Sequence, residues 1–498
     1  IYTMINTFDW FKKWAGYTPE KIAVKDADSG QSLSYTDLNT AGNALAYYWQ
    51  KEVELQIGDR VAIIAENHLA QVILFAAALK SGIVLVPINF RLAPKEIRTL
   101  LSDAQCKLAY MDGSIAEERL EYQTIYKNLN SVYAFIGKDT GPLYQPEISE
   151  ESPVFILYTS GTTGLPKGTV YTHKMLFWNS INTTQSLLIN NNTTTLNCMP
   201  LFHTGGWNVL LTPVLHRGGT VIMFKKFEPL AVLNCIITEQ LDLFMAVPTM
   251  LKMMVELEEF EKADISCLNY IIVGGESMPL PLIETFHAKH VPIRQGYGLT
   301  EAGPNLTSLH QNEAARKQGS IGKPNFYVEI RIVNEEGLDV APNTPGEILI
   351  GGPMVMPKYW QNKEATDNAK LGRWLRTGDI GRMDGEGFIY IMDRKKNMYI
   401  SGAENVYPAE VERALLQHPA VKEAVVIAAP HPKWGECGIA FIVSNENISD
   451  GDLEDHCKEQ LAKFKIPSQF HFVASIPKND TGKIDRKAIR LQYLNKVS

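Results

Sequence analysis

The run Tyr158-Thr-Ser-Gly-Thr-Thr-Gly-Leu-Pro-Lys-Gly168 is the stretch around which the rest of the chain can be organised. It follows an apolar run, Pro153 to Leu157, that is typical of a buried strand, and a helix is expected from His173 to Leu188. Glycines let backbone N–H groups approach an anion closely, serine and threonine add donors, and Lys167 adds a compact positive charge. The run therefore predicts a polyphosphate-binding loop in a strand-to-helix turn.

The spacing of this loop differs from that of a Walker loop. Walker loops have four residues between their glycines and then Gly-Lys-Ser/Thr, whereas Gly161 and Gly164 are closer together and Lys167 is followed by Gly168. A plain surface loop is the alternative interpretation, but the specificity of the run favours a nucleotide site. The run resembles the signature of the adenylate-forming superfamily, which includes acyl-CoA synthetases, firefly luciferase and the adenylation domains of peptide synthetases. The resemblance implies that the loop holds the β- and γ-phosphates of ATP through Thr159, Ser160, Gly161, Thr162, Thr163, Gly164 and Lys167.

Composition indicates an ordinary globular protein of 498 residues with 45% hydrophobic and 21% charged residues. At roughly 150 residues per domain, this length suggests two to four structural units. A net charge of −7 argues against a protein that coats nucleic acid, so an anion such as ATP needs a locally basic site.

Cysteine usage and hydropathy bear on location. Six scattered cysteines show neither metal-ligand spacing nor the density of a disulfide scaffold, which fits a reducing cytoplasm. No secretory signal and no apolar run of about 18 residues is visible, so a transmembrane segment is not expected. The sequence leaves three questions open: whether the protein contacts a membrane peripherally, whether it forms a homodimer, and whether residues 1–3 are native.

The order of apolar runs predicts an α/β fold: a large N-terminal domain of two βα sheets with a small β unit, followed by a small α+β domain. Strands in the first series are expected at 61–64, 84–87, 108–111 and 132–136, with helices near 68–80 and 94–102. A second series follows, with strands at 196–199, 220–224, 243–247 and 270–273. After residue 320 the alternation changes to that of antiparallel strands, and a charged run at 393–396 precedes a compact tail.

A second motif, Tyr297-Gly-Leu-Thr-Glu301, follows an expected strand at 291–295. Ligands of open α/β sheets bind beyond the carboxyl ends of strands, which suits this position. A threonine hydroxyl can donate to phosphate, and Glu301 is a suitable ligand for Mg²⁺, which binds through few carboxylates plus phosphates. The motif resembles the second signature of the family, where the threonine contacts the α-phosphate and the glutamate holds magnesium. The resemblance to acyl-CoA synthetases implies ATP, Mg²⁺ and coenzyme A as cofactors.

Further segments match the family in order along the chain. Gly274, Gly275 and Glu276 resemble the segment beside adenine, and Tyr297 and Gly298 belong to the same nucleotide site. Asp379 matches the carboxylate that accepts ribose hydroxyls, and Arg394 matches an arginine that contacts ribose and phosphate. The resemblance covers Leu33 to Lys483.

The C-terminal part resembles a mobile lid. The resemblance implies an adenylation domain over 1–392, a lid over 393–498 and a hinge at Asp393. Lys483 matches the lid lysine that stabilises negative charge as a carboxylate attacks the α-phosphorus. Residues Ser401, Gly402 and Ala403 match a loop on the coenzyme A side. Catalytic roles are thereby implied for Lys483, Thr300, Glu301 and His203.

The nature of the acid follows from the segment Phe202-His-Thr-Gly-Gly-Trp207. Amino-acid-activating relatives place an aspartate where His203 stands, so an acid without an α-amine is expected. His203, Trp207, Gly275 and Tyr297 are the expected acid-pocket residues, although Trp207 could equally be a packing residue. Together with the motifs above, the resemblance implies an ATP-dependent acid–CoA ligase that forms acyl-AMP and pyrophosphate, then acyl-CoA and AMP.

A medium- or long-chain fatty acid is the first choice of substrate, and an aromatic acid is the second. Two other classes of function stay open at this point. One is an adenylate-forming enzyme that uses another acceptor, such as luciferase or an enzyme that loads a carrier protein. The other is a non-catalytic nucleotide-binding regulator, which would usually lack Glu301 or Lys483.

Replacement of Lys483 by alanine should slow acyl-AMP formation by orders of magnitude, because one fixed cation in a water-poor cleft can contribute several kcal/mol of transition-state stabilisation. Thioester formation from preformed acyl-AMP should be spared. Separate single-turnover assays of the two half-reactions measure this, and an equal loss in both would contradict a lid with two working positions.

Overall fold

The computed structural model describes residues 8–112, 124–138, 147–159, 166–274, 278–401, 404–478 and 484–497. Two compact units make up the chain: residues 1–330 with 350–375, and residues 331–349 with 376–498. A functional division at Asp393 into an adenylation domain and a lid stays a prediction. Within the described ranges, no helix is both long and apolar enough to cross a membrane.

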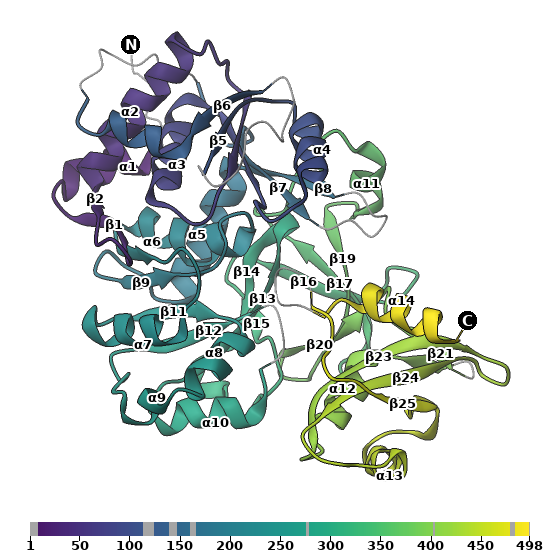
Figure 1. Ribbon diagram of the computed structural model, residues 1–498. Helices are drawn as coiled ribbons and strands as arrows, with labels where there is room; N and C mark the ends of the chain where they lie inside the picture. The colour runs from purple at the N-terminus through teal and green to yellow at the C-terminus, as the bar shows by residue number, and fades with distance from the viewer. Residues whose placement is uncertain are drawn as a thin grey trace. The chain divides into compact units, whose positions relative to one another are not determined.

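The first unit contains the two predicted βα series as two sheets (Figure 1). A six-stranded sheet has the order β6-β5-β3-β4-β7-β8 among the described residues. Its strands are β3 (Arg60–Ile64), β4 (Val84–Ile88), β5 (Cys106–Met111), β6 (Ile125–Asn128), β7 (Pro153–Thr159) and β8 (Lys167–Thr172). The strands from β6 to β7 are parallel, as expected for strands connected through helices, and β8 runs antiparallel to β7.

The second sheet has nine strands in the order β15-β14-β13-β12-β11-β9-β10-β1-β2, counted over the described part of the chain. Its strands are β1 (Ile22–Asp26), β2 (Ser32–Ser34), β9 (Thr194–Asn197), β10 (Thr220–Met223), β11 (Leu243–Ala246), β12 (Tyr270–Val273), β13 (Ile293–Leu299), β14 (Gly303–Ser308) and β15 (Lys323–Pro324). The middle of this sheet is parallel, and the antiparallel strands β14 and β15 extend one edge.

Helices connect these strands and pack on the sheets. They are α1 (Trp10–Tyr17), α2 (Tyr35–Lys51), α3 (Leu69–Ser81), α4 (Pro94–Ala104), α5 (His173–Ser186), α6 (Thr212–Arg217), α7 (Pro229–Thr238), α8 (Pro248–Val255), α9 (Glu258–Lys262), α10 (Leu280–Ala288) and α11 (Lys363–Asn368). All residues of α3 are buried, because this helix is apolar around nearly its whole circumference and contacts β1 of one sheet and β4 of the other.

The expected strand at 132–136 is wrong. Residues Leu129–Phe135 form a 3-10 helix, η2, in which Leu129 and Val132 are buried one turn apart. The side chain of Asn128 accepts a hydrogen bond from the backbone N–H of Asn130 at 2.9 Å and so starts the helix. The other expected strands and helices of the first series are confirmed.

The antiparallel strands predicted after residue 320 form a sheet in the order β16-β17-β19-β18, with β20 beside β19. These strands are β16 (Glu329–Val333), β17 (Gly346–Gly351), β18 (Lys370–Leu371), β19 (Trp374–Met383) and β20 (Ile389–Arg394). The tail folds into a further sheet, β22-β21-β24-β23 with β25 beside β24. Its elements are β21 (Tyr399–Ser401), β22 (Glu404–Val406), α12 (Pro408–Leu415), β23 (Val421–His431), β24 (Gly435–Ser444), α13 (Asp450–Gln460), β25 (Gln469–Phe472) and α14 (Arg486–Val497).

A buried ion pair attaches α1 to α3. Lys80 Nζ donates to Asp9 Oδ2 at 2.7 Å, and the two side chains are 0% and 1% exposed. Asp9 also accepts from the backbone N–H of Lys12 at 3.1 Å, so it starts α1 while neutralising Lys80.

Substitution of Asp9 by alanine should lower the free energy of unfolding by about 3–5 kcal/mol, because it leaves the Lys80 charge buried without its carboxylate. The matched control is Asp367→Ala, which breaks an exposed pair with Lys363 and should cost less than about 1 kcal/mol. Denaturant titration measures both values, and similar costs would contradict the importance of the buried pair.

Candidate active site

The glycine-rich run lies between two strands of one hairpin. β7 ends at Thr159 and β8 begins at Lys167, and these two residues are antiparallel partners. The predicted strand-to-helix turn is therefore wrong, because β8 intervenes before α5. Residues Thr169 to Thr172 favour a strand, since all are β-branched or aromatic and all are buried. The loop residues Ser160, Gly161, Thr162, Thr163 and Gly164 lie outside the described residues.

The ends of this hairpin are held in position by backbone pairing with a segment further along the chain. The hydroxyl of Thr159 donates to the carbonyl of Lys167 at 3.4 Å. Beside β8, Val170 N–H donates to the Lys358 carbonyl at 3.2 Å, and Trp360 N–H donates to the Gly168 carbonyl at 2.6 Å. Residues 358–360 thus add an extended segment to β8.

Tyr359, in that segment, connects the phosphate hairpin to the second motif. Its hydroxyl donates to Glu301 Oε1 at 2.9 Å, and Lys167 Nζ lies 5.5 Å from the centroid of its ring. The backbone N–H of Met356 donates to the Glu301 carbonyl at 2.8 Å. The structure therefore brings Lys167 and Glu301 to one place. Sequence reasoning missed Tyr359, because it lies 58 positions from Glu301 and belongs to no motif.

Thr300 and Glu301 form a short 3-10 turn, η4 (Thr300–Ala302), directly after β13, as the position beyond a strand end predicted. The described residues contain no group of three or more histidine, cysteine, aspartate or glutamate side chains that could hold a metal ion. A single carboxylate fits Mg²⁺ that arrives with a nucleotide, because this ion keeps phosphate and water ligands and needs few protein carboxylates.

His203 precedes a π-helical turn, η3 (Gly206–Leu211), which continues into α6. A Cβ at Gly206 would lie 2.3 Å from the Pro200 carbonyl oxygen, so this close turn requires glycine. Trp207 is fully buried, with its ring 5.1 Å from that of Phe155 and 5.6 Å from that of Phe75. These contacts give Trp207 a packing role, and its role as a wall of the acid pocket stays a prediction.

The residues expected beside adenine lie at the ends of neighbouring strands. Gly274 follows β12, and Tyr297 and Gly298 lie on β13, which pairs with β12 in parallel. A Cβ at Gly298 would lie 2.2 Å from the Pro304 backbone, because the chain folds back over this position. Gly275 and Glu276 are not among the described residues.

In the second unit, Asp379 and Arg394 are partners on β19 and β20. Arg394 Nε lies 2.7 Å from Asp379 Oδ1, so the carboxylate predicted to bind ribose is paired with the arginine predicted to contact it. Asp393 Oδ2 accepts from the Ala409 N–H at 2.8 Å, in the first turn of α12. Ser401 is buried at the end of β21. Gly402, Ala403 and Lys483 fall outside the described ranges.

Two family models match the chain. The model described as "AMP-binding enzyme" matches residues 11–360, and "AMP-binding enzyme C-terminal domain" matches residues 410–483. The chain belongs to the AMP-binding enzymes. The members to which it is similar include a 2-succinylbenzoate–CoA ligase of Bacillus velezensis, 36% identical over 98% of both chains. A long-chain-fatty-acid–CoA ligase of Mycobacterium tuberculosis is 34% identical over 96% of this chain and 97% of the relative.

Solved structures of AMP-binding enzymes have the same fold. One is the o-succinylbenzoate CoA synthetase of Bacillus subtilis in complex with its acyl-adenylate intermediate. It has a TM-score of 0.88 and 32% identity over 97% of this chain and 98% of that chain. The same synthetase, also at a TM-score of 0.88, has been solved with ATP and a magnesium ion.

Substitution of Tyr359 by phenylalanine should raise the Mg²⁺ concentration needed for half-maximal pyrophosphate release about tenfold, because residues that orient a metal-binding carboxylate typically contribute 10–100-fold to metal affinity. A magnesium titration of acid-dependent pyrophosphate release measures this. Tyr17→Phe, at an exposed tyrosine, is the control. An unchanged magnesium requirement would show that the Tyr359 hydroxyl does not position a metal ligand.

Proposed function

We propose that this AMP-forming acid–CoA ligase activates a ring-containing carboxylic acid with polar substituents, in place of the medium- or long-chain fatty acid that the sequence favoured. The acid carboxylate attacks the α-phosphorus of ATP and displaces pyrophosphate, giving acyl-AMP. The thiolate of coenzyme A then attacks the acyl carbon, and AMP leaves.

The observation that carries the choice of acid is a cluster of buried and half-buried polar side chains beside η3. Asn305 Nδ2, on β14, donates to Thr183 Oγ1 at 2.7 Å and to the Val209 carbonyl at 3.1 Å. Asn179 Nδ2 donates to the Asn208 carbonyl at 2.7 Å. Amides and hydroxyls of α5 and β14 thus gather against η3, the turn that follows His203.

A long alkyl chain gains stability by burying apolar area, at about 25 cal/mol per Å². A wall of amides and hydroxyls offers little apolar surface for this purpose, whereas polar substituents on a ring can exchange hydrogen bonds with it. One similar relative is named for 2-succinylbenzoate and another for long-chain fatty acids. The polar cluster favours the first class.

Several residues have proposed roles in catalysis. Lys167 and the hydroxyls of the glycine-rich loop hold the β- and γ-phosphates, and Thr300 donates to the α-phosphate. Glu301 would hold magnesium, which would supply positive charge to the phosphates. Tyr359 orients the Glu301 carboxylate through its 2.9 Å hydrogen bond. Lys483 supplies positive charge when the carboxylate attacks.

A panel of acids tests this proposal through pyrophosphate release and thioester mass. The panel contains straight-chain acids from hexanoate to hexadecanoate, and benzoate, phenylacetate and hydroxylated cinnamates. We expect kcat/KM for the best ring acid to exceed that for the best alkyl acid by at least tenfold. A preference for octanoate or longer chains would contradict the proposed substrate class, and pyrophosphate release without a thioester would contradict coenzyme A as the acceptor.

A further inference from the structure

The segment 199–203, which ends at His203, follows β9 of the nine-stranded sheet, but two loops of the six-stranded sheet contact it. One of these loops follows β3 and carries Asn67, and the other follows β4 and carries Phe90. Ligands of α/β sheets bind beyond the carboxyl ends of strands. The segment therefore lies where carboxyl ends of strands from both sheets come together.

Asn67 uses its side-chain amide to hold this segment to the end of a neighbouring strand. The residue is 4% exposed. Its Nδ2 donates to the Met199 carbonyl at 3.0 Å and to the Phe224 carbonyl, just after β10, at 3.1 Å. Its Oδ1 accepts from the Leu201 N–H at 2.9 Å. Because hydrogen bonds fix direction as well as distance, this amide sets the path of the backbone from 199 to 201.

The backbone position that Asn67 sets continues to His203 through one tight turn. The His203 N–H donates to the Pro200 carbonyl at 3.2 Å, and the His203 carbonyl accepts from the Gly206 N–H at 3.1 Å. Pro200 is the middle residue of 199–201, whose two outer residues are the ones that Asn67 binds. A shift of 199–201 therefore moves His203 and the start of η3 with it.

The second loop contacts the side chain that precedes His203. The ring centroid of Phe202 lies 4.5 Å from that of His203 and 6.0 Å from that of Phe90, and both pairs are edge-to-face. The Arg91 guanidinium carbon lies 5.3 Å from the Phe90 centroid and 6.0 Å from the Phe202 centroid. Edge-to-face pairs have a preferred geometry, so these rings orient the His203 ring while Asn67 fixes its backbone.

We propose that Asn67 is a positioning residue for the acid, acting through segment 199–203, and that it controls binding of the acid and leaves binding of the nucleotide unaffected. This inference rests on the proposed function and on the acid-pocket role expected for His203. A displacement of about 1 Å at a reacting site can cost about 100-fold in rate, so a residue that only holds such a segment has a large effect on the reaction.

The variant Asn67→Asp tests the proposal with a side chain of nearly the same size. An ionised carboxylate can accept from the Leu201 N–H but cannot donate to the Met199 and Phe224 carbonyls. We expect KM for the acid to rise at least about tenfold, while KM for ATP changes less than about twofold. Pyrophosphate release, with the best acid of the panel described above, measures both constants.

Calorimetry gives a readout that does not depend on turnover. The two probes are AMP and the non-reactive acyl sulfamate of adenosine that carries the same acid. Asn67→Asp should bind AMP with an unchanged Kd and the acyl sulfamate at least about tenfold more weakly. Equal weakening for both probes would show that Asn67 does not act on the acid side of the site and would overturn the proposal.

The matched control is Thr124→Val, which removes a buried hydrogen bond at the start of β5. Thr124 is 7% exposed, and its hydroxyl donates to the Cys106 carbonyl at 2.9 Å. Both variants should lower Tm by a few degrees, because each leaves a buried carbonyl unpaired. Thr124→Val should keep the wild-type KM for the acid. A lower Tm for Asn67→Asp with wild-type KM for both substrates would show a purely structural role and overturn the proposal.

A second variant, Phe90→Leu, keeps the test decisive if Asn67→Asp folds poorly. It keeps an apolar side chain and removes the ring that contacts Phe202. KM for the acid should rise about two- to tenfold, the range that the loss of one aromatic pair gives, with KM for ATP unchanged. An unchanged KM for the acid in this variant would contradict positioning of His203 by the loops of the six-stranded sheet.

The two proposals fail in different ways. A wild-type enzyme that prefers a long alkyl acid would contradict the proposed substrate class and leave the test of Asn67 in place, because that test uses whichever acid reacts best. A wild-type enzyme that prefers a ring acid, with wild-type KM for that acid in Asn67→Asp, would overturn the role of Asn67 and leave the substrate class in place.

Discussion

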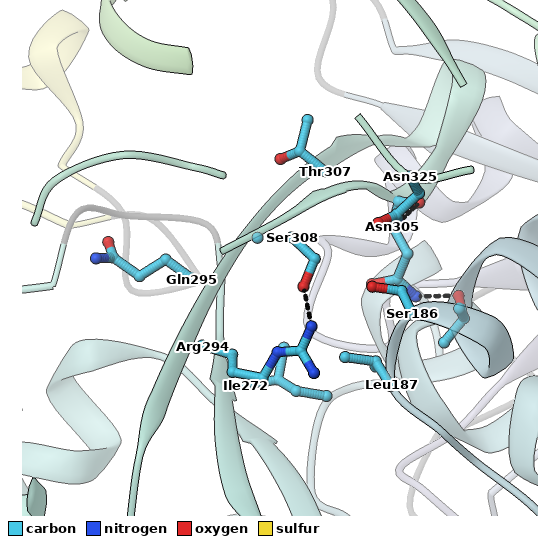
Figure 2. A pocket seen from close by; sticks show the side chains of 11 residues that line it. Ser186, Leu187, Ile272, Arg294, Gln295, Asn305, Thr307, Ser308 and Asn325 are labelled. Carbon is cyan, nitrogen blue, oxygen red and sulfur yellow. Dashed lines mark hydrogen bonds between the residues drawn. The ribbon is translucent and has the colours of Figure 1, made fainter. Parts of the chain in front are cut away.

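Alternate residues of a strand face the same side of a sheet, and on β13 this constraint sets the geometry of the whole proposed acid site. The strand places Arg294 and Gly296 on the covered face and ends at Leu299, directly before Thr300 and Glu301, so one element holds the turn proposed to be catalytic and the cavity shown in Figure 2. Parallel pairing with β12 and antiparallel pairing with β14 fix its position on both sides. A binding site built on such a strand has a fixed length, so it can select among acids of one class by the length of the acid.

The nucleotide end of the site depends on backbone pairing over a long separation in sequence. The segment 358–360 pairs with β8, and this pairing brings the Tyr359 hydroxyl to Glu301 and its ring to Lys167. Lys167 on β8 and Glu301 after β13 otherwise belong to two different sheets. Tyr359 therefore connects the phosphate hairpin to the turn after β13. A substitution in the hairpin is expected to shift the Glu301 side chain, and a substitution in the turn is expected to shift Lys167.

The sequence predicted most of the architecture, because buried parallel strands such as 61–64 and 270–273 are nearly continuous apolar runs with clear ends. The strand predicted at 132–136 was wrong. Valine, tyrosine and phenylalanine favour strands, but the Asn128 cap and the burial of Leu129 and Val132 one turn apart stabilise a 3-10 helix instead. Local motifs suggested Glu301 and Lys167 as site residues, and those roles stay predictions. Tyr359 was not suggested, since it joins Glu301 and Lys167 only through contacts made in the folded chain.

The most direct measurement is a crystal structure of the protein with the adenylate of a hydroxylated cinnamate bound. The account predicts that the substituted ring lies against the polar cluster of Thr183 and Asn305, with the adenylate phosphate beside Thr300. A ring that lies against apolar side chains alone, away from Asn305, would contradict it.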